Sequence, residues 1–146
     1  MKKSTKFIIA LLVTVGALAI TYRVVNQAPS KDLAADAQMQ EIITSGGCLQ
    51  CHSGSPDLPF YANWPVASGM VQKDVTQGYR AFDMTEMAEA LKAGKPVGKV
   101  ALAKVEKVIM DGTMPKHAYY MVHWGSSVTD AKKEMAMAWV KQHRLA

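Results

Sequence analysis

Two cysteines followed by a histidine constrain this chain more than any other feature. Cys48, Cys51 and His52 form a Cys-x-x-Cys-His pattern, and the 146 residues contain no further cysteine. This spacing is typical of c-type haem attachment, in which two thiols bond the two vinyl groups of haem while the histidine reaches the iron. The sequence therefore predicts one covalent haem c, held by Cys48 and Cys51, with His52 as an axial iron ligand.

A Cys-x-x-Cys pair by itself has other uses. It can be a dithiol redox pair, half of a zinc site or a structural disulfide. No second Cys-x-x-Cys completes a zinc site, and the alternation of strands and helices that surrounds a thioredoxin-like motif is missing from the sequence. The histidine directly after Cys51 favours haem over these alternatives.

The net charge of +5 does not indicate a nucleic-acid partner. Four of the 17 basic residues lie before position 31, which leaves 13 basic residues against 12 acidic ones in residues 31–146. With nearly equal numbers of basic and acidic residues, residues 31–146 lack the excess of positive charge that is typical of nucleic-acid-binding domains. We therefore expect no nucleic-acid partner.

The N-terminal segment has the pattern of an export signal. Lys2, Lys3 and Lys6 precede an apolar run from residue 7 to residue 22, as in a charged n-region followed by an h-region. Ala17 and Ala19 offer a cleavage site, but spanning a bilayer takes about 20 apolar residues, and the run approaches that length if it continues to residue 25. We favour a retained anchor, with the rest of the chain on the periplasmic side of the bacterial inner membrane, over a soluble periplasmic protein.

The chain then divides into three parts and reads as all-α. We assign residues 1–25 to the signal or anchor, 26–30 to a linker and 31–146 to a haem-binding domain of about 115 residues. Ser30 is expected to cap the first helix of this domain, with Leu33 on its buried face, and Thr129 to cap the last, with Ala131, Ala138 and Trp139 buried. The predicted helices are residues 31–44, 69–76, 85–93, 99–110 and 129–143.

Two stretches are expected to be irregular and to line the haem. Residues 53–70 combine three prolines with Tyr61 and Trp64, which suggests a loop wrapped over a haem edge. The carbonyl of Pro59 or Pro65 is a candidate to orient the His52 ring. The second stretch, residues 111–125, has its own candidates for the iron.

Residues 111–125 bring a soft sulfur close to two imidazoles. Gly112 ends the preceding helix and Pro115 stiffens the turn that carries Met114, so this thioether is a candidate sixth iron ligand. His117 and His123 remain alternative ligands, and an open iron position is a third possibility.

Taken together, these motifs resemble a class I cytochrome c and, more closely, the bacterial haem-binding domain family, which often accompanies or is fused to di-haem cytochrome c peroxidases. In class I cytochromes the methionine before proline is the sixth ligand, which corresponds to Met114. The residues that carry the resemblance are Cys51, His52, Ser53, Pro59, Phe60, Tyr61, Pro65, Val66, Asp74, Val75, Gly78, Gly112 to Pro115, Tyr120, His123 and Trp139.

The resemblance implies an electron carrier. We expect a mono-haem cytochrome that is not itself an enzyme and exchanges single electrons with redox proteins, among them a di-haem cytochrome c peroxidase. The rival hypothesis is a peroxidase-associated or gas-binding haem domain with an open iron position, where His117 or His123 acts on the bound molecule.

Overall fold

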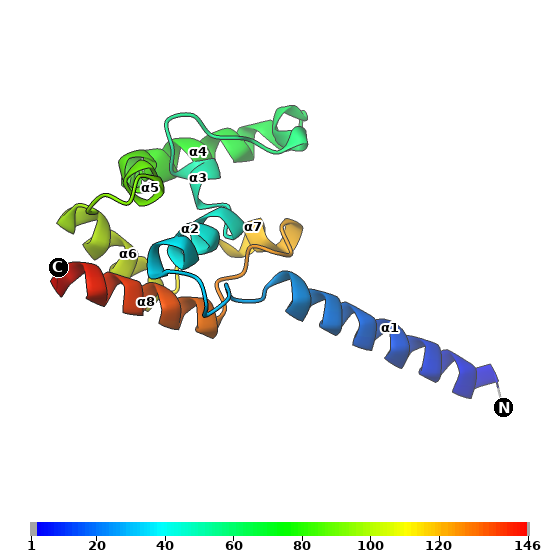
Figure 1. Cartoon of the computed structure of the whole chain (residues 1–146). Helices are drawn as coiled ribbons and strands as arrows, with labels where there is room; N and C mark the ends of the chain where they lie inside the picture. The colour runs from blue at the N-terminus through cyan, green and yellow to red at the C-terminus, as the bar shows by residue number, and fades with distance from the viewer. Residues whose placement is uncertain (1–2, 146) are drawn as a thin grey trace.

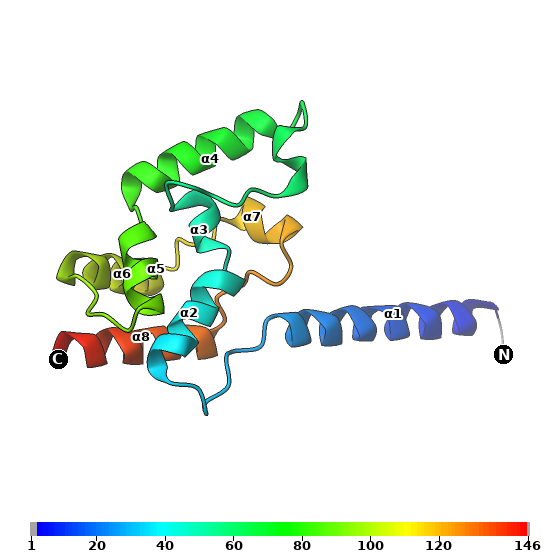
Figure 2. The same cartoon turned by 45° about the horizontal axis from the view of Figure 1, so that its top comes forward.

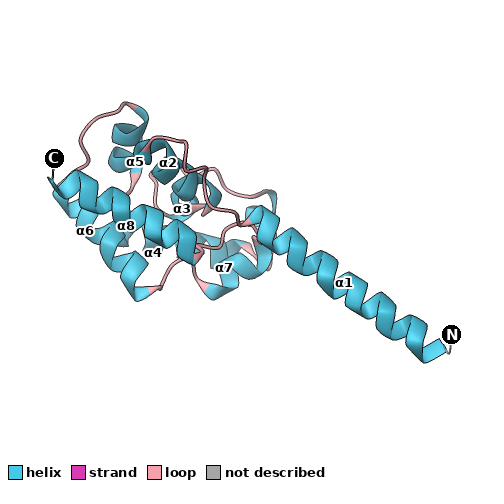
Figure 3. Ribbon diagram, turned by 60° about the horizontal axis from the view of Figure 1, so that its bottom comes forward, coloured by secondary structure: helices cyan, strands magenta, loops and turns pink. Residues whose placement is uncertain are grey.

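The computed structural model describes residues 3–145, and helices are the only regular elements in that range (Figures 1 and 3). Met1, Lys2 and Ala146 lie outside the described residues. The predicted all-α class is confirmed. The elements are α1 (Lys3–Val25), α2 (Ala35–Ser45), α3 (Cys48–Cys51), the 3-10 helix η1 (Phe60–Asn63), α4 (Ser68–Ala81), α5 (Thr85–Lys92), α6 (Lys99–Asp111), α7 (His117–Val122) and α8 (Asp130–Leu145).

Helix α1 projects away from the other helices (Figures 1 and 2). Its segment Ser4–Val25 is long and apolar enough to cross a membrane, and every residue of that segment is exposed. A helix that exposes apolar side chains all round is unfavourable in water and favourable in lipid. The predicted N-terminal apolar helix is therefore present.

The core lies where α8 crosses α2 and α6, with α5 packed on the far side of α2. Trp139 of α8 is 1 % exposed, and its indole Nε1 donates to Oδ1 of Asp36 in α2 at 2.7 Å. This bond fixes the register of α8 on α2. The core residues are Met39, Ile42, Ile43, Met84, Met87, Leu91, Val97, Leu102, Val105, Ala136, Trp139 and Val140.

Helix α2 begins later than the sequence predicted. Ser30 does not cap it: its Oγ accepts from the backbone N of Asp32 at 3.2 Å, and Leu33 N bonds Ser30 O in the same turn. The helix starts at Ala35 without a side-chain cap. Leu33 is therefore exposed, and the prediction that it belongs to the buried face is wrong.

The buried face of α8 also differs from the prediction. Thr129 does cap the helix, since its Oγ1 accepts from Lys132 N at 3.4 Å. Ala131 and Ala138, however, are exposed, while Lys132 is buried. The buried face of α8 thus differs from the predicted one. Lys132 can be buried because its Nζ donates to Ser45 Oγ and Ser127 O, and hydrophobic periodicity does not take such polar partners into account.

Two of the predicted boundaries change as well. Helix α4 runs on to Ala81 rather than ending near residue 76. The stretch 111–125, predicted to be irregular, contains α7, whose first turn forms when Tyr119 N bonds Lys116 O at 2.9 Å. A six-residue helix gives too short a pattern for periodicity to reveal.

Candidate haem-binding site

The Cys-x-x-Cys-His segment forms one helical turn directly after α2. Gly47 adopts a left-handed conformation, with φ of 65°, and this turns the chain from α2 into α3. The backbone N of His52 then bonds Cys48 O at 3.0 Å and closes the turn. Both cysteines are free thiols. The two thiols therefore lie on α3, and the histidine lies at its end.

A backbone carbonyl orients the His52 ring. Its Nδ1 lies 2.8 Å from Phe82 O, at the end of α4, and Met84 N in turn donates to His52 O at 2.7 Å. A carbonyl only accepts, so Nδ1 carries the proton and Nε2 keeps its lone pair for a metal. The sequence predicted that the carbonyl of Pro59 or Pro65 orients the ring. In the structure it is the carbonyl of Phe82.

Helix α4 reaches α3 because residue 78 is glycine. A Cβ on Gly78 would lie 2.5 Å from Cys51 O and 2.9 Å from Cys51 Cβ. Any side chain at this position would push the two helices apart. This close approach brings Phe82, about four turns after the start of α4, onto the His52 ring.

A second group of polar side chains joins η1 and α7 to α3. Tyr61 Oη lies 2.9 Å from His123 Nε2, and Tyr119 Oη donates to Gln50 Oε1 at 2.7 Å. The rings of Tyr119 and His123 are stacked with centroids 4.0 Å apart. Lys116, just before α7, also pairs with Asp74 of α4 at 2.6 Å. α7 is therefore held over the x-x residues of the motif.

The residues of the motif are partly buried. Burial raises the pKa of the Cys48 thiol to about 11 and raises the pKa of Cys51 as well. Burial also raises the pKa of Tyr119 to about 12, and it lowers the pKa of the buried Lys132 ammonium. Such an environment keeps thiols protonated and suits an apolar macrocycle.

A cavity of about 40 Å³ lies beside Cys51, between α3, α4, η1 and α7. That volume is roughly the space of one water molecule. A larger hollow of about 450 Å³ lies at the C-terminal end of α8, away from the motif. The residues that line the small cavity are Gln50, Cys51, Leu58, Pro59, Tyr61, Val71, Asp74, Val75 and Tyr119.

The structure brings some of the predicted site residues together and leaves others apart. Tyr61 and His123 lie beside the motif, as described above. Met114 is 38 % exposed and does not line the small cavity, and Trp64 is exposed next to Pro65. His117 is exposed and bonds Tyr120 Oη. Within residues 3–145, no three His, Cys, Asp or Glu side chains are grouped to hold a metal ion.

Sequence reasoning missed three residues at this site. Phe82 contributes a backbone carbonyl, which no side-chain pattern reveals. Tyr119 and Gln50 meet across 69 residues of sequence. The four-residue spacing of Tyr119 and His123 was a usable signal, because it places both rings on one face of any helix there.

An all-helical domain with a Cys-x-x-Cys-His turn, a carbonyl-oriented histidine and aromatic neighbours defines a haem-binding domain. Residues 7–142 match the family described as Haem-binding domain, and the chain belongs to this family.

A curated relative points in the same direction. Cytochrome c peroxidase Ccp of Escherichia coli (strain K12) is 36 % identical over 98 residues, which cover 67 % of this chain and 21 % of the relative. The chain thus spans about a fifth of that relative's length. No solved structure matches significantly.

Proposed function

We propose that this chain is a mono-haem c-type cytochrome that carries single electrons and is not itself an enzyme. One observation carries the proposal: two free thiols flank a single helical turn, and the next residue is a histidine whose Nδ1 is taken by Phe82 O at 2.8 Å. This donor set fits haem c, with two thiols for its vinyl groups and one imidazole nitrogen for its iron.

Each residue of the motif has a separate role. Cys48 and Cys51 would hold haem through two thioether bonds, which would keep the cofactor from dissociating. His52 donates Nε2 to the iron, and Phe82 O holds its ring in one orientation. When bound, haem supplies a one-electron redox centre whose potential depends on its axial ligands.

Met114 is the proposed sixth ligand. The choice rests on the turn from Gly112 to Pro115 that presents the thioether, because the Tyr61 Oη contact that engages the alternative His123 at Nε2 would itself open on haem binding. His117 is likewise bonded to Tyr120. A thioether favours ferrous iron more than an imidazole does and closes the iron to other molecules, which suits an electron carrier.

Haem binding requires a local opening of the domain. The cavity beside Cys51 is far smaller than a porphyrin, so η1 and α7 have to separate. The Tyr61–His123 and Tyr119–Gln50 hydrogen bonds span this gap and would break or rearrange. Pro65, Tyr61 and Trp64 are then available to cover the haem edge.

Helix α1 supports a location for this protein, and the similarity to a peroxidase supports a partner. We propose that α1 anchors residues 31–146 on the periplasmic side of the bacterial inner membrane, where thiols meet haem for covalent attachment. The relation to a peroxidase sequence supports a cytochrome c peroxidase as the electron-accepting partner. A second candidate, a peroxide- or gas-binding domain with an open iron position, is favoured by the same similarity to a peroxidase.

The first experiment tests covalent attachment. Haem should stay with the polypeptide after denaturation and acid-acetone extraction, and the alkaline pyridine spectrum should report two thioether bonds. Cys48→Ser and Cys51→Ser should each leave one bond, while Ser45→Ala, a nearby change that spares both thiols, should leave two. Extraction of the haem from the wild-type protein would refute the proposal.

The second experiment tests the sixth ligand and the electron-carrier role together. Met114→Ala should remove the sulfur-to-iron charge-transfer band and lower the potential. His123→Ala, and the exposed-methionine control Met110→Ala, should retain the band. Rapid carbon monoxide binding by the reduced wild type would favour the open-iron candidate instead.

A further inference from the structure

The junction between α1 and the rest of the chain is a fixed contact rather than a free tether. Asn26 is 3 % exposed, although it follows directly after the apolar helix. Its Nδ2 donates to Trp124 O at 2.6 Å, and its Oδ1 accepts from Ser127 N at 2.9 Å. A buried amide whose donor and acceptor are both paired in this way holds the contact in one geometry.

The preceding turn of α1 strengthens this contact. Tyr22 Oη lies 2.8 Å from Ser127 Oγ, and the Tyr22 ring meets the Trp124 ring edge to face, with centroids 6.4 Å apart. Gly125 lies against Val25, since a Cβ there would be 3.5 Å from Val25 O. The segment between α7 and α8 is therefore attached to the last turn of α1.

The length of α1 places this junction at the edge of a bilayer. Its 23 residues extend about 34 Å at 1.5 Å per residue, close to the roughly 30 Å of a hydrocarbon core. If α1 spans, Val25 lies at the outer interface. Tyr22, Arg23 and Trp124 then lie at the depth where tyrosine, tryptophan and basic side chains are enriched.

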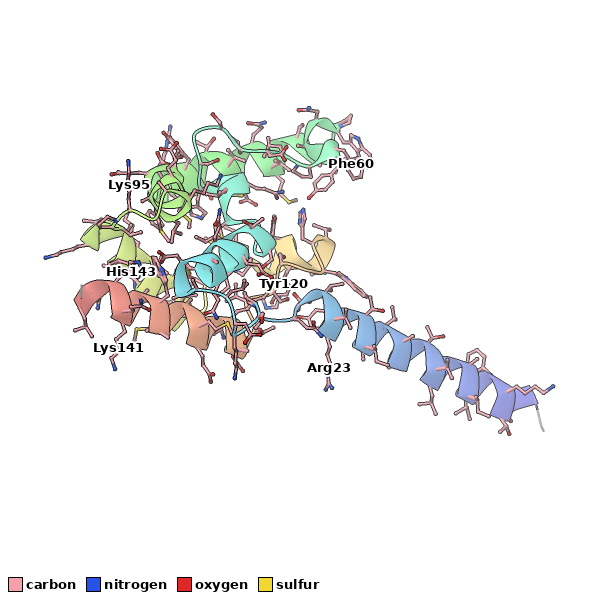
Figure 4. All side chains as sticks on the ribbon, in the orientation of Figure 1. Arg23, Phe60, Lys95, Tyr120, Lys141 and His143 are labelled. Carbon is pink, nitrogen blue, oxygen red and sulfur yellow. The ribbon has the colours of Figure 1, made fainter. Side chains whose placement is uncertain are left out.

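The end of α7 and the residues just after it carry exposed apolar side chains. Met121 is 71 % exposed, Val122 69 % and Trp124 46 %. Figures 1 and 2 show α7 beside the end of α1 that joins the domain, and Figure 4 places Tyr120 of α7 on the side from which α1 leaves. Neighbouring apolar side chains of this size are costly in water but favourable in the interfacial layer of a membrane.

We propose that Met121, Val122 and Trp124 form a lipid-contacting surface that lies in the headgroup layer of the membrane spanned by α1. This proposal rests on the proposed anchor. The occupant is lipid because Trp124, at the end of this surface, is bonded to Asn26, and Ser127 to Tyr22, so the surface is continuous with α1. The domain would consequently keep one fixed orientation on the membrane.

Spin labels on the full haem-loaded protein test this proposal. Met121→Cys, labelled with a nitroxide after haem has consumed the native thiols, is compared with Val100→Cys, an equally exposed position on α6. In vesicles of phosphatidylcholine and phosphatidylglycerol, the Met121 label should be accessible to oxygen and protected from a water-soluble nickel complex. The Val100 label should show the reverse, and unchanged haem spectra confirm folding.

One further variant separates the possible failures. A label at Leu12→Cys, in the middle of α1, reports whether the helix is embedded, so a water-exposed Leu12 label refutes the anchor and this inference with it. An embedded Leu12 label with a water-exposed Met121 label refutes only the lipid-contacting surface. Dipolar broadening at Met121 would mean that a second copy covers the surface, and would also refute it.

The fixed junction can be tested in the same way. A Gly-Ser-Gly-Ser insertion between Val25 and Asn26 lengthens the connection without changing any residue of the domain. If the junction alone positions the surface, the Met121 label becomes accessible to the nickel complex. If protection persists, α7 contacts lipid without help from the junction, and the inference that the junction fixes the orientation of the domain is refuted.

Discussion

Replacement of Gly78 by alanine measures how tightly α4 must approach the Cys-x-x-Cys-His turn. The added Cβ would lie 2.5 Å from Cys51 O, about 0.9 Å short of the 3.4 Å at which ordinary contact begins. The clash is with backbone, which cannot rotate away. Overpacking of this kind costs about 1–3 kcal/mol, whereas alanine gains about 0.5–1 kcal/mol over glycine inside a helix. The net expectation is a loss of about 0–2.5 kcal/mol in the free energy of unfolding, and of about 1–3 kcal/mol relative to an alanine that meets no clash.

Gly69→Ala is the matched control for this substitution. Gly69 lies in the first turn of the same helix, and a Cβ there meets nothing within 4 Å. This variant should be as stable as the wild type or slightly more stable. Urea unfolding followed by circular dichroism on the full chain in detergent gives both values. If Gly78→Ala proves as stable as Gly69→Ala, the close packing of α4 on Cys51 is refuted.

Three further predictions concern the core and the titrating groups. Asp36→Ala should lower the free energy of unfolding by about 1–3 kcal/mol, because the buried Trp139 Nε1 loses its acceptor; denaturant titration measures this loss. Burial lowers the pKa of Lys132, so the unfolded chain binds more protons and stability should rise with pH toward the ordinary lysine pKa of 10.5; Lys132→Met should abolish this rise in pH-dependent melting. In the folded chain without haem, burial raises the pKa of Cys48 from 9.0 to about 11. The stability that comes from its protonated thiol should therefore be present below pH 9.0 and be lost as the pH rises from 9.0 to about 11. The pH dependence of Cys48 alkylation should show a midpoint at about 11.

The haem motif shows what a local pattern can predict. Cys48, Cys51 and His52 lie within five residues, so a single helical turn brings them together whatever the rest of the chain does. The caps at Thr129 and Gly112 are equally local, and both occur where the sequence predicted them. The sequence determined these features because each depends on interactions within a few residues.

The carbonyl partner of His52 shows what a local pattern cannot predict. Phe82 lies 30 residues away, and its backbone oxygen reaches the ring only because Gly78 lets α4 approach Cys51. The buried Lys132 is a similar case, since Ser45 Oγ at 3.3 Å comes from a different helix. Nothing in the residue types along either helix specifies these partners.

The sequence by itself therefore determined the helical class, the apolar N-terminal helix and the spacing of the haem motif. The tertiary structure decided which carbonyl orients His52, which face of α8 is buried and how α1 joins the domain. Asn26 reads as part of a polar linker, yet it is buried because Trp124 O and Ser127 N, about 100 residues later, satisfy its amide. Hydrogen-bonding groups accept burial only where partners exist, and only the folded chain brings those partners within reach.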